Sequence, residues 1–465
     1  MAGSPSFPAL VAQARQALEE HLDACARGEG GVVDLRPPQD FAAELELARW
    51  VAEGGMDEDA FAAWIRRYLA GATHLHHPGY IGHQVAVTLP ATAVADLING
   101  VTNNGMAIHE MGPPAVALEL AMLEWMCAKA GLPEGSGGVL THGGSLANLT
   151  ALAAARAAVA PEAWAAGTPC DLVLLAPADS HYCVARAAGL LGLGTDAIRT
   201  LPVDEVGRIL PAEVERVGAA AEAAGERVMA VVANACITAT GLHDDLAAIG
   251  ATCRRRGWWF HVDAAHGASA LLSAKERHHL AGCELADSLV WDAHKMLGVS
   301  ALCAAVLLRE ESRLPAAFQQ DASYLGDPGG GCGPDLFHRA VECTKVPLGL
   351  KLFLTLAIHG ESGLAAQLEG LYERTRRFAA RLAEDPRTEV LCAPESNIFC
   401  FRFGGEAVDQ MALRRRLIDE GDFYITATRF GGRDWLRLTV MNPATDEVTF
   451  ASLLDRLEAL AALPS

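Results

Sequence analysis

The chain has 465 residues, 51% of them hydrophobic and 20% charged, and carries a formal net charge of −20 at pH 7. This length is more than one ordinary domain needs, so we expect a large domain with one or two smaller segments. The acidic charge excludes a nucleic-acid partner, because no basic tract is present that could neutralise phosphates. It leaves room for an acidic substrate, since a pocket can be locally basic inside an acidic protein.

The N-terminal segment, residues 1–22, carries Glu and Arg within an amphipathic pattern and lacks the apolar core of a secretory signal. The longest strongly apolar runs, such as residues 301–308, are far shorter than a membrane span. Twelve cysteines are scattered without paired CxxC spacing, which is typical of reduced thiols inside a cell. We therefore predict a cytoplasmic protein with no membrane partner.

Hydrophobic patterns divide the chain into three parts, which we place at residues 1–85, 86–345 and 346–465. The first part has the amphipathic pattern of helices. The second alternates apolar strands with amphipathic helices, which predicts an α/β domain with a mainly parallel sheet covered on both faces. The third begins with a long helical stretch and then alternates strands with helices, which predicts a smaller α+β domain. Functional side chains gather at the carboxyl ends of such parallel strands.

A lysine that follows two apolar strands ending in acids is the most informative feature of the chain. The first predicted strand ends in Asp263, and the second ends in Asp292, which is followed by His294 and Lys295. An unpaired ammonium is costly to bury, whereas a buried neutral lysine can condense with an aldehyde. A carboxylate on a neighbouring strand can keep the ring nitrogen of a pyridine cofactor protonated, which makes the ring an electron sink. The combination points to pyridoxal 5′-phosphate (PLP) acting on an amino acid; a surface lysine is the alternative.

Two glycines and a serine between a predicted strand and an Ala-rich helix form a candidate phosphate site. Gly143 and Gly144 allow close approach of the backbone, and Ser145 can cap the helix. The N-terminus of a helix presents free N–H groups to an anion, so a phosphate monoester fits there. The alternative is an ordinary connection between a strand and a helix.

Three further side chains are candidates for contact with the cofactor or the substrate. His181 follows a predicted strand and can stack on a flat ring or exchange a proton, with a helix-capping histidine as the alternative. Thr238 lies at another strand end, where a turn hydroxyl is the alternative. Tyr324 precedes the Gly-rich segment 326–335. A tyrosine on a closing loop can deliver a proton while water is excluded, and a surface tyrosine is the alternative.

Histidines gather in residues 74–83, but their spacing does not indicate a metal site. His74, His76, His77 and His83 have neither the helical HxxxH spacing nor a carboxylate partner that would suit zinc. We therefore predict no metal ion for this chain.

The order of the motifs is more informative than any one of them. GGSLAN, DSHY, TATGLHDD, HVDAAHG, WDAHKMLGV and FQQDASY follow one another from residue 143 onward. In this the chain resembles the group II PLP-dependent amino acid decarboxylases, which include glutamate, cysteine sulfinate, diaminobutyrate and aromatic amino acid decarboxylases. The resemblance extends from about residue 75 to the C-terminus. It implies an α/β fold of PLP fold type I (aspartate aminotransferase-like), with a mainly parallel seven-stranded sheet. It also implies a homodimer with shared active sites, to which residues 1–85 contribute.

Matched residue by residue, the resemblance implies a role for each candidate. Lys295 corresponds to the lysine that binds the PLP aldehyde, and Asp263 to the partner of the pyridinium nitrogen. His181 and Ala265 correspond to residues on the two faces of the ring, and Tyr324 to the tyrosine that protonates the substrate carbon after CO2 leaves. The implied catalytic residues are Lys295, Tyr324 and His181. The implied cofactor-binding residues are Gly144, Ser145, Thr238, Asp263, Ala265, Asp292, His294 and Lys295, and the implied substrate-binding residues are His83, Gln84 and Arg437.

Several positions depart from the usual pattern of the family. The chain has NACIT at residues 234–238, His266 where an aromatic residue is common, and Gly79 where a larger residue is usual. His83 and Gln84 stand where members that act on aromatic substrates carry aromatic residues. A polar wall favours a polar or acidic side chain, because buried polar groups left unpaired lower the affinity for an apolar one.

We therefore expect a PLP-dependent α-decarboxylase that forms CO2 and an amine from an L-amino acid such as aspartate, glutamate, cysteine sulfinate or 2,4-diaminobutyrate. Two alternatives remain open. One is a PLP-dependent lyase or aldehyde synthase on the same scaffold, and the other is a non-catalytic family member that acts as a binding partner. Tyr324 argues against the oxidative aldehyde synthase, and the joint presence of Lys295, Asp263 and His181 argues against a non-catalytic role.

Overall fold

The structure is a computed structural model that describes residues 5–320 and 332–463. Tyr324, the predicted proton donor, lies outside the described residues. The described chain forms two compact units. The larger unit comprises Gln84–Glu373 and the short segment Pro394–Ile398. The smaller unit comprises the chain up to His83, the segment Arg374–Ala393 and the chain from Phe399 onward.

The larger unit is built on a seven-stranded sheet with the order β2-β8-β7-β6-β5-β3-β4. All neighbouring pairs from β7 to β4 are parallel, whereas β8 runs antiparallel to both β2 and β7. This confirms the expected mainly parallel seven-stranded sheet. The strands are β2 (Gly137–Thr141), β3 (Leu172–Pro177), β4 (Ile198–Leu201), β5 (Arg227–Asn234), β6 (Trp259–Asp263), β7 (Ser288–Asp292) and β8 (Ala304–Leu308).

Side chains of the central strands alternate between two apolar cores, one on each face of the sheet. In β7, Leu289 and Trp291 belong to one core and Val290 belongs to the other. All three side chains are fully buried. Burial on both faces explains why this strand is almost continuously apolar in the sequence.

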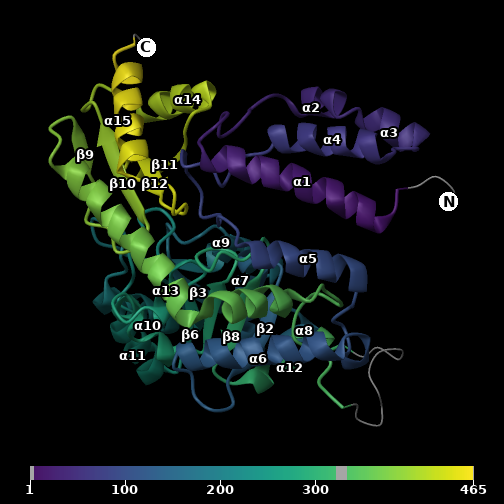
Figure 1. Cartoon of the computed structure of the whole chain (residues 1–465). Coiled ribbons are helices and arrows are strands. Elements are labelled where there is room, and N and C mark those ends of the chain that lie inside the picture. Colours follow the sequence, from purple (N-terminus) through teal and green to yellow (C-terminus); the bar gives the residue numbers. More distant parts are fainter. Residues whose placement is uncertain (1–4, 321–331, 464–465) are drawn as a thin grey trace. The chain divides into compact units, whose positions relative to one another are not determined.

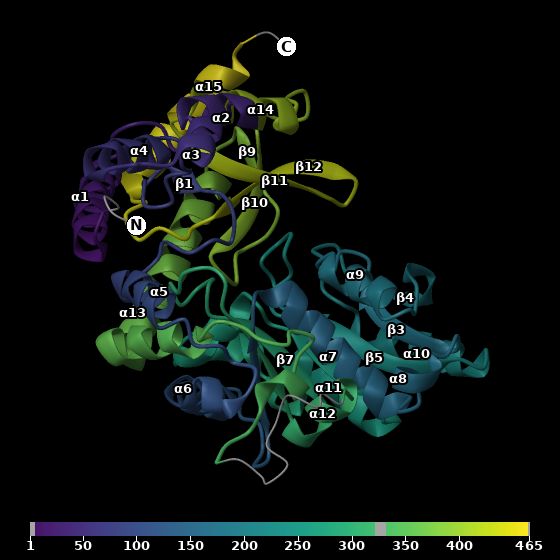
Figure 2. The same ribbon diagram turned by 90° about the vertical axis from the view of Figure 1, so that its right-hand side faces the viewer.

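Helices cover both faces of this sheet (Figures 1 and 2). The core that contains Trp291 also contains side chains of α6, α10, α11 and α13, and the core that contains Val290 contains side chains of α7, α8, α9 and α12. The helices are α5 (Pro90–Thr102), α6 (Pro113–Lys129), α7 (Gly144–Val159), α8 (Ala163–Ala166), α9 (Cys183–Leu190), α10 (Pro211–Ala223), α11 (Leu246–Arg256), α12 (Leu314–Ala317) and α13 (Leu348–Ala383). Short 3-10 helices are η1 (His109–Met111), η2 (Thr195–Ala197), η3 (Gly267–Leu272), η4 (Arg277–Leu280), η5 (Cys283–Leu285), η6 (Glu311–Arg313) and η7 (Leu336–His338).

The smaller unit joins the two ends of the chain in a five-stranded sheet with the order β1-β11-β12-β10-β9. The N-terminal strand β1 pairs in parallel with β11, and the pairs β11–β12 and β9–β10 are antiparallel. The strands are β1 (Tyr80–Ile81), β9 (Thr388–Val390), β10 (Ile398–Phe403), β11 (Tyr424–Phe430) and β12 (Arg433–Thr439). The helices are α1 (Phe7–Ala26), α2 (Pro38–Glu44), α3 (Leu47–Glu53), α4 (Glu58–Ala70), α14 (Gln410–Glu420) and α15 (Glu447–Ala461).

Two global features of the sequence can be compared with the structure. Of the helices in the described parts of the chain, none is both long enough and apolar enough to cross a membrane. The twelve cysteines all lie within the described residues, are free thiols, and are mostly buried.

Candidate active site

A cavity of about 280 Å³ lies in the larger unit, at the carboxyl ends of its parallel strands. Asn234, Asp263 and Asp292, the last residues of β5, β6 and β7, line it. Side chains at the ends of neighbouring parallel strands converge at one edge of a sheet, which is where the sequence pattern predicts the site. The predicted site residues that line this one cavity are Gln84, Gly144, Ser145, His181, Thr238, Asp263, Ala265, Asp292, His294 and Lys295.

Lys295 lies three residues beyond the end of β7, and its amine faces the carboxylate that ends that strand. Its Nζ atom lies 3.2 Å from Oδ2 of Asp292, whose side chain is only 1% exposed. Burial lowers the pKa of Lys295, but the charges of Asp292 and Asp263 outweigh this effect, so the pKa lies above its ordinary value. In the protein alone the lysine is therefore an ammonium held by carboxylates, and not a neutral amine.

The carboxylate of Asp263 is held from two sides at the end of β6. Oδ1 accepts a hydrogen bond from the backbone N–H of Ala265 (3.2 Å), and Oδ2 accepts one from Nδ2 of Asn148 (3.3 Å). The thiol of Cys183 lies 4.0 Å from Oδ2. These contacts fix the orientation of the carboxylate. Asp263 is thus suited to hold a proton on the nitrogen of a cationic ring.

His181 lies in the loop between β3 and α9, with its ring beside that of Tyr182 at a centroid distance of 4.2 Å. Its Nδ1 atom accepts a hydrogen bond from the N–H of Cys183 (3.3 Å). Burial lowers the pKa of His181, and the charge of Lys295 adds to this, whereas the charge of Asp263 opposes it. The ring is therefore neutral at pH 7, with its proton on Nε2. In this form it can stack on a flat ring or donate a hydrogen bond.

The start of α7 leaves room for an anion. Gly143 has a φ of 98°, which favours glycine, and a Cβ atom on Gly144 would lie 2.6 Å from Oδ2 of Asp292. No side chain caps this helix, and Leu146 and Ala147 are the first residues whose N–H groups donate to the carbonyl of Gly143. The N–H groups of Gly144 and Ser145, which precede them, can therefore bind an anion. The prediction that Ser145 caps the helix is wrong, because the cap position is occupied by Gly143 and the serine is already inside the first turn.

The ring of His294 is oriented by the backbone next to Lys295. Its Nδ1 atom lies 2.9 Å from the carbonyl oxygen of Cys303, and its Nε2 atom lies 3.7 Å from Oδ2 of Asp292. Thr238 lines the cavity from the loop that follows β5. These contacts leave the imidazole next to the start of α7 and to the lysine amine, where it can contact a phosphate.

Sequence reasoning missed several residues that line the cavity. Asn148 lies four positions after Gly144, so the period of the helix places both on one face. Asn234 ends β5, and the strand-end rule could have found it. His266, noted only as a departure from the family pattern, has its Nε2 atom 2.6 Å from Oδ1 of Asn397. Further missed residues are His142, Tyr182, Cys236 and Leu302.

His83 and Arg437, two of the predicted substrate-binding residues, belong to the smaller unit and are described within it. Nε2 of His83 lies 3.0 Å from Oη of Tyr424. Arg437 is buried on β12, where its Nη1 atom donates to Oγ1 of Thr439 (2.9 Å). Burial and the charges of Arg437 and Arg414 lower the pKa of His83. His83 is therefore a neutral side chain at pH 7.

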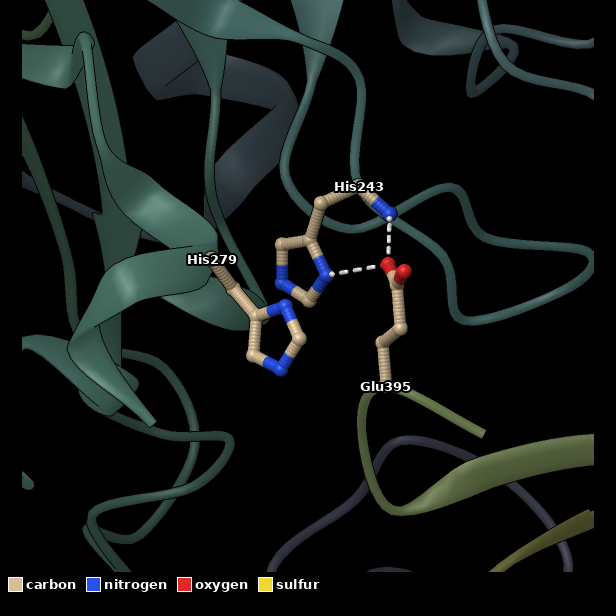
Figure 3. A group of neighbouring side chains, drawn as sticks. All are labelled: His243, His279 and Glu395. Carbon is tan, nitrogen blue, oxygen red and sulfur yellow. Dashed lines mark hydrogen bonds and ion pairs between the residues drawn. The ribbon is translucent and has the colours of Figure 1, made fainter. Parts of the chain in front are cut away.

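A second group of titratable side chains, His243, His279 and Glu395, lies outside the cavity lining (Figure 3). The nitrogen and oxygen atoms that could bind a metal lie within 4.8 Å of one another. The two imidazoles are stacked, with 15° between their planes and 4.9 Å between their centroids. Lone pairs in two nearly parallel planes do not converge on one ion about 2 Å from each nitrogen. Glu395 also pairs with Arg208. We therefore interpret the group as a hydrogen-bonded cluster that anchors the segment Pro394–Ile398.

The residues around the cavity fit PLP. Lys295 would supply an amine for the aldehyde, Asp263 a carboxylate for the ring nitrogen, and the start of α7 backbone donors for the phosphate. Oδ1 of Asp292 is buried and has no hydrogen-bond partner among the described residues. This oxygen can therefore accept a hydrogen bond from a bound molecule. A side chain at Gly144 would fill part of this space.

Comparisons with known proteins agree with this chemistry. A family model described as pyridoxal-dependent decarboxylase conserved domain matches residues 57–404, and one described as aminotransferase class I and II matches residues 355–457. The chain is 32% identical over 461 residues to the cysteine sulfinic acid decarboxylase of Mus musculus, which covers 92% of this chain and 91% of that protein. It is 28% identical over 455 residues to the L-aspartate decarboxylase dtxS4 of Metarhizium robertsii, which covers 95% and 90%. A crystal structure of mouse CSAD superposes with a TM-score of 0.90 at 27% identity and covers 98% of both chains.

Proposed function

The chain belongs to the pyridoxal-dependent decarboxylases, and from this premise we propose that it removes the α-carboxylate of an L-amino acid with an acidic side chain. The products are CO2 and the corresponding amine. The single observation that carries the proposal is the cavity in which Lys295, Asp263, His181 and the start of α7 meet. This arrangement matches the four groups that the reaction needs, because each serves a different part of PLP or of the substrate.

The relatives support an acidic substrate. One similar protein is a decarboxylase of cysteine sulfinic acid and another is a decarboxylase of L-aspartate, and both substrates carry a second acidic group. Gln84 lines the cavity with a polar amide. We propose that Gln84, His83 and Arg437 bind the substrate, with Arg437 pairing with one of its carboxylates. A guanidinium suits this task, since its planar fork donates two parallel hydrogen bonds to a carboxylate.

Each cavity residue has a proposed task. Bound PLP supplies the electron sink that accepts the electron pair of the bond to CO2. Lys295 binds the cofactor aldehyde, and Asp263 holds the proton on the ring nitrogen. His181 and Ala265 would contact the two faces of the ring and fix its position between them. We propose that the phosphate and its surroundings are held by Gly144, Ser145, Thr238, Asp292 and His294. The return of a proton to the substrate carbon by Tyr324 stays a prediction from the sequence.

We further propose that the enzyme is a cytoplasmic homodimer. Helix α5 carries four exposed apolar side chains at positions i, i+3, i+4 and i+7, and these are 41–61% exposed. Such a stripe on one face of a helix suits burial against another protein surface. A second copy of this chain is the partner that the family resemblance implies. The residues of the stripe are Val94, Leu97, Ile98 and Val101.

A substrate panel tests the proposed activity. Purified enzyme with PLP is given aspartate, glutamate, cysteine sulfinate, 2,4-diaminobutyrate, tyrosine and tryptophan, and both CO2 and the amine are measured. We expect CO2 and amine in equal amounts from an acidic substrate, and no turnover by Lys295→Ala. Tyrosine or tryptophan as the preferred substrate would overturn the acidic specificity. An aldehyde in place of the amine would instead identify an oxidative enzyme on the same scaffold.

A further inference from the structure

A chain of hydrogen bonds runs through the larger unit and ends on Asp263. Nε1 of Trp259 donates to Oγ of Ser288 (2.8 Å), and the same oxygen lies 2.8 Å from Nδ1 of His261. On the other side of this imidazole, Nε2 lies 2.7 Å from Oδ1 of Asn148. Nδ2 of Asn148 then donates to Oδ2 of Asp263 (3.3 Å). The chain thus links strands β6 and β7 to helix α7 behind the cavity wall.

The groups at the two ends of this hydrogen-bond chain determine which atom carries each of its protons. Nδ2 of Asn148 also lies 2.9 Å from the carbonyl oxygen of Gly144, which can only accept, so the amide nitrogen must face Gly144 and Asp263. The amide oxygen then faces His261, which must carry its proton on Nε2. Nδ1 consequently accepts from the hydroxyl of Ser288. At the other end the indole of Trp259 can only donate, which leaves the Ser288 hydroxyl free to donate onward.

Burial strengthens the hydrogen bonds that orient the carboxylate of Asp263. His261, Asn148 and Ser288 are at most 1% exposed, so water does not compete for their hydrogen bonds. Burial lowers the pKa of His261 to about 4, with the charge of Asp263 opposing the shift, so the imidazole is neutral at pH 7. A neutral imidazole with one proton is what the chain requires. The last link is an N–H of Asn148 that donates to Oδ2 of Asp263.

We propose that Asn148 and His261 are positioning residues that hold the carboxylate of Asp263 in the orientation in which it would face the ring nitrogen of PLP. This inference rests on the proposed function, which assigns that nitrogen to Asp263. Asn148 contacts the carboxylate directly, whereas His261 acts through Asn148 by fixing the orientation of its amide. Hydrogen-bond partners behind a functional side chain orient it and tune its basicity, as they do for the ligands of metal ions.

The affinity of the apo protein for two cofactors tests the inference without measuring turnover. One cofactor is PLP, and the other is a carbocyclic analogue in which CH replaces the ring nitrogen. Asn148→Leu and His261→Leu should weaken PLP binding about tenfold, because a hydrogen bond to a charged group is lost. The same variants should bind the analogue as the parent protein does. His261→Gln, which keeps an N–H donor toward Asn148, should restore most of the PLP affinity. Equal losses for both cofactors would show a merely structural role and overturn the inference, as would unchanged PLP affinity.

Asp263→Asn separates failure of this inference from failure of the proposed function. If Asp263 faces the ring nitrogen, this variant should lose affinity for PLP and not for the analogue. If Asp263→Asn loses the preference for PLP over the analogue while the Asn148 and His261 variants keep it, the positioning role alone is refuted. If Asp263→Asn binds both cofactors with the affinities of the parent protein, the assignment of Asp263 is refuted, and the inference with it. Where a leucine variant fails to fold, Ser288→Ala takes its place. Ser288→Ala removes the hydroxyl that donates to Nδ1 of His261, so the proton of His261 is no longer confined to Nε2. It should weaken PLP binding about twofold to threefold and leave binding of the analogue unchanged.

Discussion

The amine of Lys295 lies 3.2 Å from the carboxylate of Asp292, a residue that is almost completely buried. The two residues are three positions apart, at the point where β7 ends. The pair means that a cofactor aldehyde meets an ammonium and not a free amine. Since only the neutral amine attacks an aldehyde, the proton of Lys295 must leave before PLP is bound covalently.

The rate at which the apo protein takes up PLP should therefore depend on pH. We expect the rate to rise about tenfold per pH unit between pH 6 and 8, because the neutral fraction of Lys295 grows by that factor below its raised pKa. Asp292→Asn removes the larger opposing charge, so burial then lowers the pKa of Lys295 and uptake at pH 7 should be faster. The rate is followed by the absorbance of the bound cofactor. Pyridoxal without its phosphate should show the same acceleration, and a slower Asp292→Asn protein would contradict the prediction.

Gly144→Ala should weaken PLP binding at least tenfold. The added Cβ atom would lie 2.6 Å from Oδ2 of Asp292, so either the helix start or the carboxylate must move. Gly370→Ala is the matched control, because Gly370 is in the middle of α13 and a Cβ atom there meets nothing within 4 Å. The control should leave PLP affinity unchanged and raise the free energy of unfolding by roughly 0.5–1 kcal/mol. Titration of apo protein with PLP and urea unfolding measure the two effects.

Acid should destabilise the larger unit in two pH ranges that two variants can separate. Burial and the neighbouring His243 and His278 lower the pKa of His279 to about 4, so the unfolded chain binds more protons and stability falls as pH drops from 6.5 to 4. Burial raises the pKa of Glu395, but His243 and Arg208 outweigh it and bring the pKa to about 2. Its contribution is present above pH 4.5 and is lost as pH falls toward 2.

His279→Gln should remove the loss of stability between pH 6.5 and 4, and Glu395→Gln should remove the loss between pH 4.5 and 2. Each shift corresponds to a change in the free energy of unfolding on the order of 3 kcal/mol across its range. Urea midpoints measured every half pH unit give the two profiles. Glu215→Gln, at an exposed ion pair with Arg255, serves as the control and should follow the parent curve. A Glu395→Gln protein destabilised equally at pH 3 and pH 7 would disprove the assignment.

Arg437→Met should change substrate preference and the titration of His83 together. Loss of a pairing with a carboxylate should lower kcat/KM for the acidic substrate by about 10- to 100-fold. Removing the charge of Arg437 should also raise the pKa of His83, which NMR titration can follow. Arg402→Met is the control, because Arg402 is equally buried in the same sheet and donates to the carbonyl of Asp434. If the pKa of His83 rises but kcat/KM does not change, Arg437 does not bind the substrate.

The chemistry of the cavity could be predicted from the sequence because its residues stand next to strand ends. Asp263, Asp292 and Lys295 each follow an apolar run, and a parallel sheet brings such positions together whatever the detailed packing is. Gly143 and Gly144 at the start of α7 and the position of His181 are local signals of the same kind. The mainly parallel sheet follows from the alternation of apolar strands and helices, and its seven strands follow from the family resemblance.

Other features depend on partners far away in the sequence. The Asn148–His261 hydrogen bond joins residues 113 positions apart, and the pairing of β1 with β11 joins the two ends of the chain. No local pattern specifies such contacts, because each residue alone is compatible with an ordinary core or turn position. The sequence by itself therefore determined which reactive groups are present and at which edge of the sheet they meet. Only the tertiary structure decided their protonation, because the charge of Lys295 and the proton on His261 depend on burial and on the groups that fold against them.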